Sequence, residues 1–256
     1  MRFINESELF LLEEVVKRNF SAKYKDSALG ILWTVFKPLL IMVLLTIIFS
    51  TMFSRSIENY PVYMLSGRCI YDCFSSSISS SLTSIKNNKN ILQKTGAPKH
   101  IFVLGAIISE FINLGITFVI LLVVMLATKA PFDFMTIPFA IIPIISLAIM
   151  VTGLGFMLSI FNVYYTDVGH LWSVFVMMLM YSLAIFYPMD MVPEPFRFYL
   201  CLNPLYWIID QFRCFVYMQT LPSVLNIVNS LLFSSILLVL GLIVFKKYES
   251  KVLMKL

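Results

Sequence analysis

The sequence predicts an all-α integral membrane protein, and two properties of its composition support this fold class. Hydrophobic residues make up 59% of the 256-residue chain and charged residues only 13%, whereas soluble domains are about half apolar and about a quarter charged. A chain of this length has too little interior to hide so much apolar surface from water. Its apolar residues also gather in runs of about 20, the length that a helix needs to cross a bilayer.

Six such runs are predicted to be membrane-spanning helices within a single transmembrane domain over residues 31–256. Their expected ranges are 31–53, 62–85, 101–128, 134–161, 169–187 and 225–245. Several glutamates near the start interrupt the apolar core that a cleavable signal peptide requires, so the N terminus is expected to stay in the mature protein.

Residues 1–30 are predicted to form a cytoplasmic interface segment ahead of the first span. Its apolar residues recur at spacings of three and four: Leu9, Leu12, Val16 and Phe20. This periodicity predicts an amphipathic helix that is too polar to span the bilayer and suited to its inner surface. Lys23 and Lys25 are placed to meet anionic lipid headgroups, although a simple role in fixing topology explains the same charges.

The distribution of cations predicts the orientation. Six spans put both termini on one side, together with the loop at 86–100, and these segments hold most of the 19 Lys and Arg residues. Lys37, near the inner end of the first span, is counted with them, and the remaining cations are Arg55, Arg68, Lys129, Arg197 and Arg213. Because cytoplasmic loops carry an excess of Lys and Arg, both termini are predicted to be cytoplasmic. The net charge of +5 is therefore interpreted as a signal of orientation and not of nucleic-acid binding.

Besides Lys37 near the start of the first span, three charged residues fall inside predicted spans. Arg68 and Asp72 lie four residues apart and thus on one helix face, and Glu110 lies about a third of the way into the third span. A charge near mid-bilayer costs about 2.5–3.5 kcal/mol, so it normally faces protein or water. We expect Arg68 to neutralise Asp72, Glu110 or both. A structural ion pair is favoured over a proton relay, which would need a longer chain of such groups.

The second span also carries the serine-rich stretch SSSISSSLTS at 75–84. Close helix packing is the favoured interpretation of these small hydroxyls, ahead of a polar lining. Cys69 and Cys73 are expected to be small packing residues. Cys201 and Cys214 would be able to pair in an oxidising compartment, but free thiols are favoured because sequence cannot show that the side chains converge.

Motifs for catalysis or metal binding are absent from the sequence. It contains no phosphate-binding GxxxxGK[ST] loop and no GxSxG nucleophile motif. His100 and His170 stand outside any metal-ligand spacing. No catalytic residue, metal site or cofactor is therefore assigned to this chain, and it is not expected to be an enzyme. A secondary transporter is disfavoured because two related halves are not visible.

The segment 188–222 is rich in aromatic residues and is interrupted by prolines. Its apolar stretches are too short to cross the bilayer, which predicts short helices that enter the outer leaflet and return. Asp210 and Arg213 are expected to form a polar pair. Composition favours an interfacial aromatic belt, and the alternative is a vestibule for sugars, whose rings stack on aromatic faces. The candidate aromatics are Tyr181, Tyr187, Phe196, Tyr199, Tyr206, Trp207 and Phe212.

Ordered short motifs resemble those of a known family. In chain order they are Arg18, Lys23-Tyr24-Lys25, Ser27-Ala28-Leu29-Gly30, Trp33, Pro38, Leu65-Ser66-Gly67, Ser109-Glu110, Phe161-Asn162-Val163-Tyr164-Tyr165, Asp167, Asn203-Pro204 and Arg213. Their order and spacing resemble the membrane subunit of ABC-2-type polysaccharide exporters, the permeases for O-antigen, capsule and teichoic acid. Departures from the family pattern are Thr166 in place of Arg, Ala184 in place of Pro, and the charges of Arg68 and Asp72 at usually apolar positions.

The resemblance implies a permease in which two copies of the chain line a channel for a lipid-linked polysaccharide. Each copy would pair with a separate ATPase subunit that binds ATP-Mg, in the cell membrane of a bacterium or archaeon. It further implies that Arg18, Lys23, Tyr24, Lys25 and Trp33 frame the cytoplasmic entrance. A drug- or lipid-exporting permease of the same family is the alternative.

The resemblance also implies that the 86–100 loop couples the permease to the ATPase. Ile91 and Leu92, flanked by Lys89 and Lys94, would dock into a groove of that subunit, and Asp167 would make a second contact. The alternative for this loop is a solvated basic turn that only sets the orientation.

Overall fold

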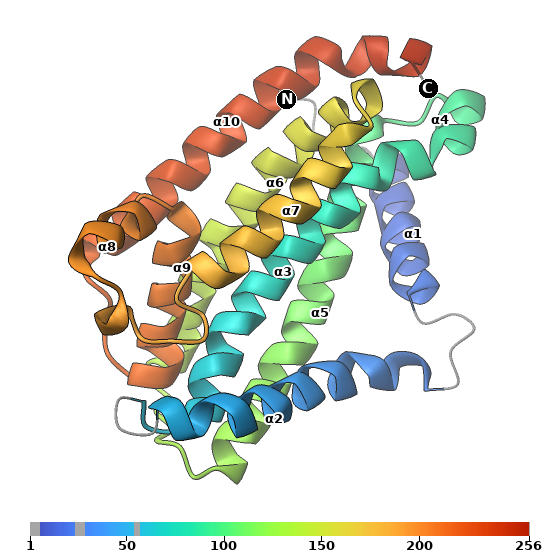
Figure 1. Cartoon of the computed structure of the whole chain (residues 1–256). Coiled ribbons are helices and arrows are strands. Elements are labelled where there is room, and N and C mark those ends of the chain that lie inside the picture. Colours follow the sequence, from blue (N-terminus) through green and yellow to red (C-terminus); the bar gives the residue numbers. More distant parts are fainter. Residues whose placement is uncertain (1–5, 24–28, 54–56, 256) are drawn as a thin grey trace.

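The computed structural model describes residues 6–23, 29–53 and 57–255, apart from the side chains of residues 50–53, 253 and 254. Within these residues every regular element is a helix (Figure 1). The α-helices are α1 (Glu6–Ala22), α2 (Trp33–Phe53), α3 (Tyr60–Asn87), α4 (Lys89–Thr95), α5 (Lys99–Ala127), α6 (Ile141–Tyr164), α7 (Asp167–Ser182), α8 (Glu194–Cys201), α9 (Pro204–Arg213) and α10 (Val224–Lys255). Short 3-10 turns are η1 (Gly30–Leu32), η2 (Ile137–Ala140) and η3 (Met189–Met191), and η4 (Cys214–Met218) is a π-helical turn. The expected all-α class is confirmed.

Four of the described helical stretches are long and apolar enough to cross a membrane. They are Gly30–Phe49, Lys99–Ala127, Ile137–Tyr164 and Val224–Val252. Helix α3 has 28 residues, but its serines and charges make it less apolar than the others. Helix α7 ends at Ser182 after 16 residues, which is short of the predicted end at 187. The chain is thus a multi-pass helical protein, and the count of six spans stays a prediction.

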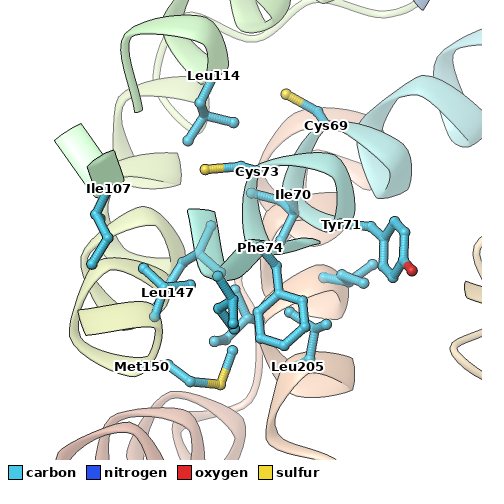
Figure 2. Packing of buried hydrophobic residues seen from close by; sticks show 14 of the residues in the cluster. Cys69, Ile70, Tyr71, Cys73, Phe74, Ile107, Leu114, Leu147, Met150 and Leu205 are labelled. Carbon is cyan, nitrogen blue, oxygen red and sulfur yellow. The ribbon is translucent and has the colours of Figure 1, made fainter. Parts of the chain in front are cut away.

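Helix α3 lies at the centre of the arrangement. Helices α5, α6 and α7 run alongside it, α10 lies along α6, and α2 crosses the ends of α3 and α5 opposite α4 (Figure 1). Figure 2 shows Ile70 and Phe74 of α3 among Ile107 of α5 and Leu147 of α6. These side chains supply the close packing of the core, because association of helices in a bilayer depends on van der Waals contact between them.

The cysteines behave as expected. Cys69 and Cys73 are buried in this core (Figure 2), and Cys201 and Cys214 are free thiols. The prediction of unpaired, packed cysteines is therefore confirmed.

The closest backbone approach brings α6 against α10. Gly153 and Gly241 face each other there, and a Cβ atom built on Gly153 would lie 2.6 Å from Leu238 Cα. Such an overlap involves backbone that has no rotamer to change, so both positions require glycine. The pattern matches the close packing of membrane helices through small residues.

We predict that Gly153→Ala destabilises the protein by about 1–3 kcal/mol, because α10 must move away to admit the methyl group. The measurement is the thermal midpoint of the purified protein in detergent. The matched control is Gly115→Ala in α5, where nothing lies within 4 Å of the added Cβ. Alanine favours a helix over glycine, so the control should unfold no earlier than the wild type, and equal midpoints for both variants would contradict the prediction.

Candidate functional site: the α1 cavity, the α2–α7 groove and the outer segment

The N-terminal helix α1 packs against α5 by one side. Val15 is buried there at 3% exposure. Gly105 of α5 makes room for it, since a Cβ atom on Gly105 would lie 3.2 Å from Val15 Cβ. On the exposed side Lys17 Nζ lies 2.8 Å from Glu13 Oε1, and this hydrogen bond and charge lower the pKa of the Glu13 carboxyl. Helix α1 is thus part of the helical bundle and has one polar face.

A polar cavity of about 610 Å³ lies between α1, α3, α4 and α5. We call it the α1 cavity. Its wall is formed mainly by hydroxyl, amide and charged side chains, among them Arg18, Lys23, Ser80, Thr83, Asn87 and Glu110. Arg18 Nη2 donates a hydrogen bond of 2.6 Å to Asn88 Oδ1, so this cation links α1 to the end of α3.

The buried carboxylate of Glu110 binds Lys23, the residue that directly follows α1. Its side chain is 2% exposed, and Lys23 Nζ lies 2.5 Å from Glu110 Oε1. Ser80 Oγ donates to the same oxygen at 2.7 Å and Asn113 Nδ2 donates to Oε2 at 3.1 Å. A buried charge is stable only when paired and hydrogen-bonded, and here a lysine and two neutral donors meet that need.

Arg68 was expected to neutralise Asp72, Glu110 or both, and Glu110 is paired with Lys23 instead. Arg68 stands 12 residues before Ser80, the α3 residue that reaches Glu110. Helical rise places them about 18 Å apart along the axis. Lys23 was expected to meet lipid headgroups and instead neutralises Glu110, because α1 folds back against α5.

The expected pairing of Arg68 with Asp72 is confirmed. Arg68 Nε lies 3.1 Å from Asp72 Oδ2. Arg68 also lines an apolar groove of about 470 Å³, which we call the α2–α7 groove. Other side chains of this groove include Leu44 and Phe49 of α2, Tyr181 of α7, and Tyr187. An ion pair thus sits at the wall of an otherwise apolar space.

In the segment 188–222, Arg213 at the end of α9 joins three parts of the chain. It is 5% exposed, and it donates to the carbonyl oxygens of Ala184 at 3.0 Å and Ile185 at 2.8 Å. Its guanidinium carbon lies 3.9 Å from the centre of the Tyr63 ring, a cation–π geometry. Gly67 leaves space for it, because a Cβ atom there would lie 3.0 Å from Arg213 Cζ.

The expected pair between Asp210 and Arg213 is wrong. Asp210 Oδ2 accepts a hydrogen bond of 3.0 Å from Asn226 Nδ2, while Arg213 turns to the carbonyls after α7. Next to Asp210, the buried Gln211 donates at 2.9 Å both to Asn226 O and to Ser230 Oγ. These bonds tie α9 to α10, and spacing within α9 gave no sign of them because the partners lie on α10.

The candidate aromatics divide into exposed and buried residues. Tyr181, Phe196 and Tyr199 are 61%, 62% and 68% exposed, and Tyr187, Tyr206 and Trp207 are partly exposed. Phe212 is 0% exposed and packs edge-on against Phe118 with ring centres 5.8 Å apart. Assigning Phe212 to a channel wall is therefore wrong, since it is a core residue of α9.

The expected coupling segment is folded as the short helix α4. Leu92 is 1% exposed, so the expectation that it docks into another subunit is wrong. A helix lying on a bundle turns one face inward, and here that face carries Leu92. Ile91 is 37% exposed, and Lys89, Lys94 and Asp167 are also exposed.

The expected entrance residues are only partly brought together. Arg18 and Lys23 line the α1 cavity. Trp33 is 44% exposed at the start of α2 and is not among the residues that line this cavity. Tyr24 and Lys25 lie outside the described residues. Among those that are described, no group of three His, Cys, Asp or Glu side chains is placed to hold a metal ion.

A family model described as ABC-2 type transporter matches residues 11–217. The chain belongs to the ABC-2 type transporter family. Family membership and the apolar helices together identify a multi-pass membrane protein. Two of the motifs noted from sequence lie side by side in the structure, because Arg213 occupies the space beside Gly67 of Leu65-Ser66-Gly67.

Relatives of this ABC-2 chain include proteins named for O-antigen export and for polysialic acid transport. The O-antigen export system permease protein RfbA of Klebsiella pneumoniae is 29% identical over 93% of this chain and 92% of its own length. A protein of the same name from Myxococcus xanthus is 24% identical over 83% of this chain and 82% of its own. The polysialic acid transport protein KpsM of Escherichia coli is 20% identical over 97% of both chains.

We predict that Lys23→Met destabilises the protein by about 3–5 kcal/mol, because it leaves the Glu110 carboxylate buried without a cation. Adding Glu110→Gln should restore most of the loss. The measurement is the thermal midpoint in detergent for both single variants and the double variant. Lys17→Met, which removes a cation from an exposed pair, is the matched control and should leave the thermal midpoint nearly unchanged, because solvent screens such a pair. A double variant no more stable than Lys23→Met would contradict the pairing.

Proposed function

We propose that this chain is the membrane permease of an ATP-driven exporter, which moves a lipid-linked polysaccharide of the O-antigen, capsule or teichoic-acid type out of the cytoplasm. The observation that carries the proposal is the similarity to RfbA and KpsM over more than nine tenths of the chain. Similarity of that extent covers the cavity, the groove and the outer segment alike.

We further propose that two copies assemble around one channel, with two ATPase subunits that bind ATP-Mg at the cytoplasmic side of a bacterial or archaeal cell membrane. The exposure of helix α2 supports a contact with a second copy, because only 6% of the residues in its most apolar stretch are buried within the single chain. Lipid and a second copy are the two surfaces that would cover it. Six spans, with α8 and α9 as outer re-entrant helices, give both termini a cytoplasmic location.

The contact with the ATPase is assigned to α4 and to the turn between α6 and α7. Both lie at the same end of the bundle (Figure 1), and they carry the exposed side chains of Lys89, Ile91, Lys94 and Asp167. ATP-driven closure of the partner subunits would reach the spans through this end. The partly and fully exposed outer aromatics are assigned to the exit, where flat rings bind sugar faces without holding any one sugar tightly.

An exporter of drugs or lipids is the second candidate. The apolar α2–α7 groove favours it, since a groove of that character also suits an amphiphile. Deleting the gene separates the two. For a polysaccharide exporter we expect the surface glycan to disappear and lipid-linked polymer to accumulate inside the cell, with both restored by a plasmid copy. Intact surface glycan in the deletion strain, with lost resistance to amphiphilic drugs, would support the second candidate.

We predict that Trp207→Ala and Tyr206→Ala each lower export roughly 2- to 10-fold, the effect of losing one aromatic contact of about 0.5–1.5 kcal/mol. The measurement is surface polysaccharide per folded transporter. Assembly should be unchanged because neither side chain is buried. Phe212→Ala is the contrasting variant, and it should reduce the amount of folded protein because it empties a core site. Normal surface polysaccharide in both exposed-site variants would contradict the lining role.

A further inference from the structure

The side of α3 that faces away from the core is polar along most of its length. From residue 68 to residue 87, every residue that is not buried is polar or charged. These residues are Arg68, Asp72, Ser75, Ser76, Ser79, Ser80, Thr83, Lys86 and Asn87. We call this set the polar face of α3. The remaining residues of this stretch, including Ser77, Ser81 and Ser84, are buried.

This polar face differs from the surfaces that suit lipid. The exposed positions of α10 are largely apolar, with Ile236, Val239 and Ile243 at 47%, 55% and 58% exposure. A hydroxyl group facing hydrocarbon loses its hydrogen bonds to water, and charges within the bilayer normally face protein or a water-filled space. The polar face therefore belongs against water or a polar cargo.

Both ends of the polar face open into spaces described above. Ser80, Thr83 and Asn87 line the α1 cavity, and Arg68 lines the α2–α7 groove. The distance along the helix from Arg68 to Asn87 is about 28 Å, close to the ~30 Å thickness of the hydrocarbon core. The face thus connects one cavity to the other over nearly the depth of a bilayer.

Hydroxyl groups on this face donate to the backbone of their own helix or, for Ser80, to Glu110, and they keep the capacity to accept. Ser76 Oγ donates to the backbone oxygen of Asp72 at 2.6 Å, and Ser79 Oγ accepts a hydrogen bond of 3.2 Å from Trp172 Nε1. A hydroxyl both donates once and accepts twice, so each keeps capacity for another partner. Hydroxyl and amide groups at successive helical turns can exchange hydrogen bonds with a polyhydroxylated chain one at a time, without a deep energy minimum.

We propose that the polar face of α3 is the track along which carbohydrate crosses the membrane, with the α1 cavity as its inner mouth and the α2–α7 groove as its outer end. This inference rests on the proposed export function and adds the ligand-contacting surface for the sugar polymer. It revises the interpretation of the serine-rich stretch as packing, because the serines divide into a buried set and an exposed set on one helix.

The first test measures access of water to the track. Cysteine is placed at Ser76 or Ser79 on the polar face, and at Ser77 or Ser81 on the buried face as matched controls. The parent carries Cys201→Ser, since the other native cysteines are buried. Assembled transporter in inside-out vesicles is treated with a charged methanethiosulfonate reagent. We expect S76C and S79C to react at least tenfold faster than S77C and S81C. Equal, slow labelling at all four positions would overturn the proposal.

The second test measures export. The triple variant Ser75→Ala/Ser76→Ala/Ser79→Ala should lower surface polysaccharide per folded transporter at least threefold. The control triple Ser66→Ala/Ser77→Ala/Ser81→Ala removes as many hydroxyls from fully buried positions of the same helix and should leave export per folded transporter unchanged. Equal export by the two triples would overturn the track while leaving the export function standing. A third outcome combines this labelling with the gene deletion described above. If S79C reacts rapidly but the deletion strain keeps its surface glycan, both the carbohydrate assignment and the export function are overturned.

Discussion

The arrangement of this membrane protein depends on the divided surface of α3. One side of the helix is buried against α5, α6 and α9, where Ile70, Phe74 and the small residues Ser77 and Ser81 fit between neighbouring helices. The other side is hydroxylated and charged. Because the apolar side is fully occupied by protein, the polar side has a fixed direction, and the two cavities lie at its ends. A uniformly apolar helix in the same place would fix neither the rotation of α3 about its axis nor its depth in the bilayer.

Three polar contacts hold other elements in place around α3 and α5. Lys23 with Glu110 fixes the end of α1, Arg18 with Asn88 fixes its middle, and Arg213 fixes α9 and the turn after α7. In a bilayer the hydrophobic effect does not by itself draw helices together, so specific packing and polar contacts define their positions. The motif residues Gly67 and Arg213 are an example in which one residue lacks a side chain because the other needs the space.

Much of the helical class and the approximate position of most spans could be predicted, because both follow from apolar runs that are local in sequence. The Arg68–Asp72 pair was predictable for the same reason, since its members are one helical turn apart. The Lys23–Glu110 pair was not, because 87 residues separate its members and only the fold brings them together. Leu92 and Phe212 were assigned to surfaces because helices of seven and 10 residues are too short for periodicity to show which face is buried. Helix α7 ends at Ser182, and the carbonyls of Ala184 and Ile185 that follow it bind Arg213 of α9, a contact between residues too far apart in sequence for a local pattern to indicate.

The burial of Leu92 has a mechanical consequence. Only Asn88 separates α3 from α4, and Leu92 fixes α4 to the bundle, so α4 cannot swing independently as a flexible loop would. We expect a force on its exposed side to reach α3 as a rotation or a tilt. Because the outward side of α3 differs so sharply from its inward side, even a small turn of this rod would change which groups meet a passing molecule. Helix α4 is thus rigidly attached to α3, the helix on whose orientation the arrangement of the others depends.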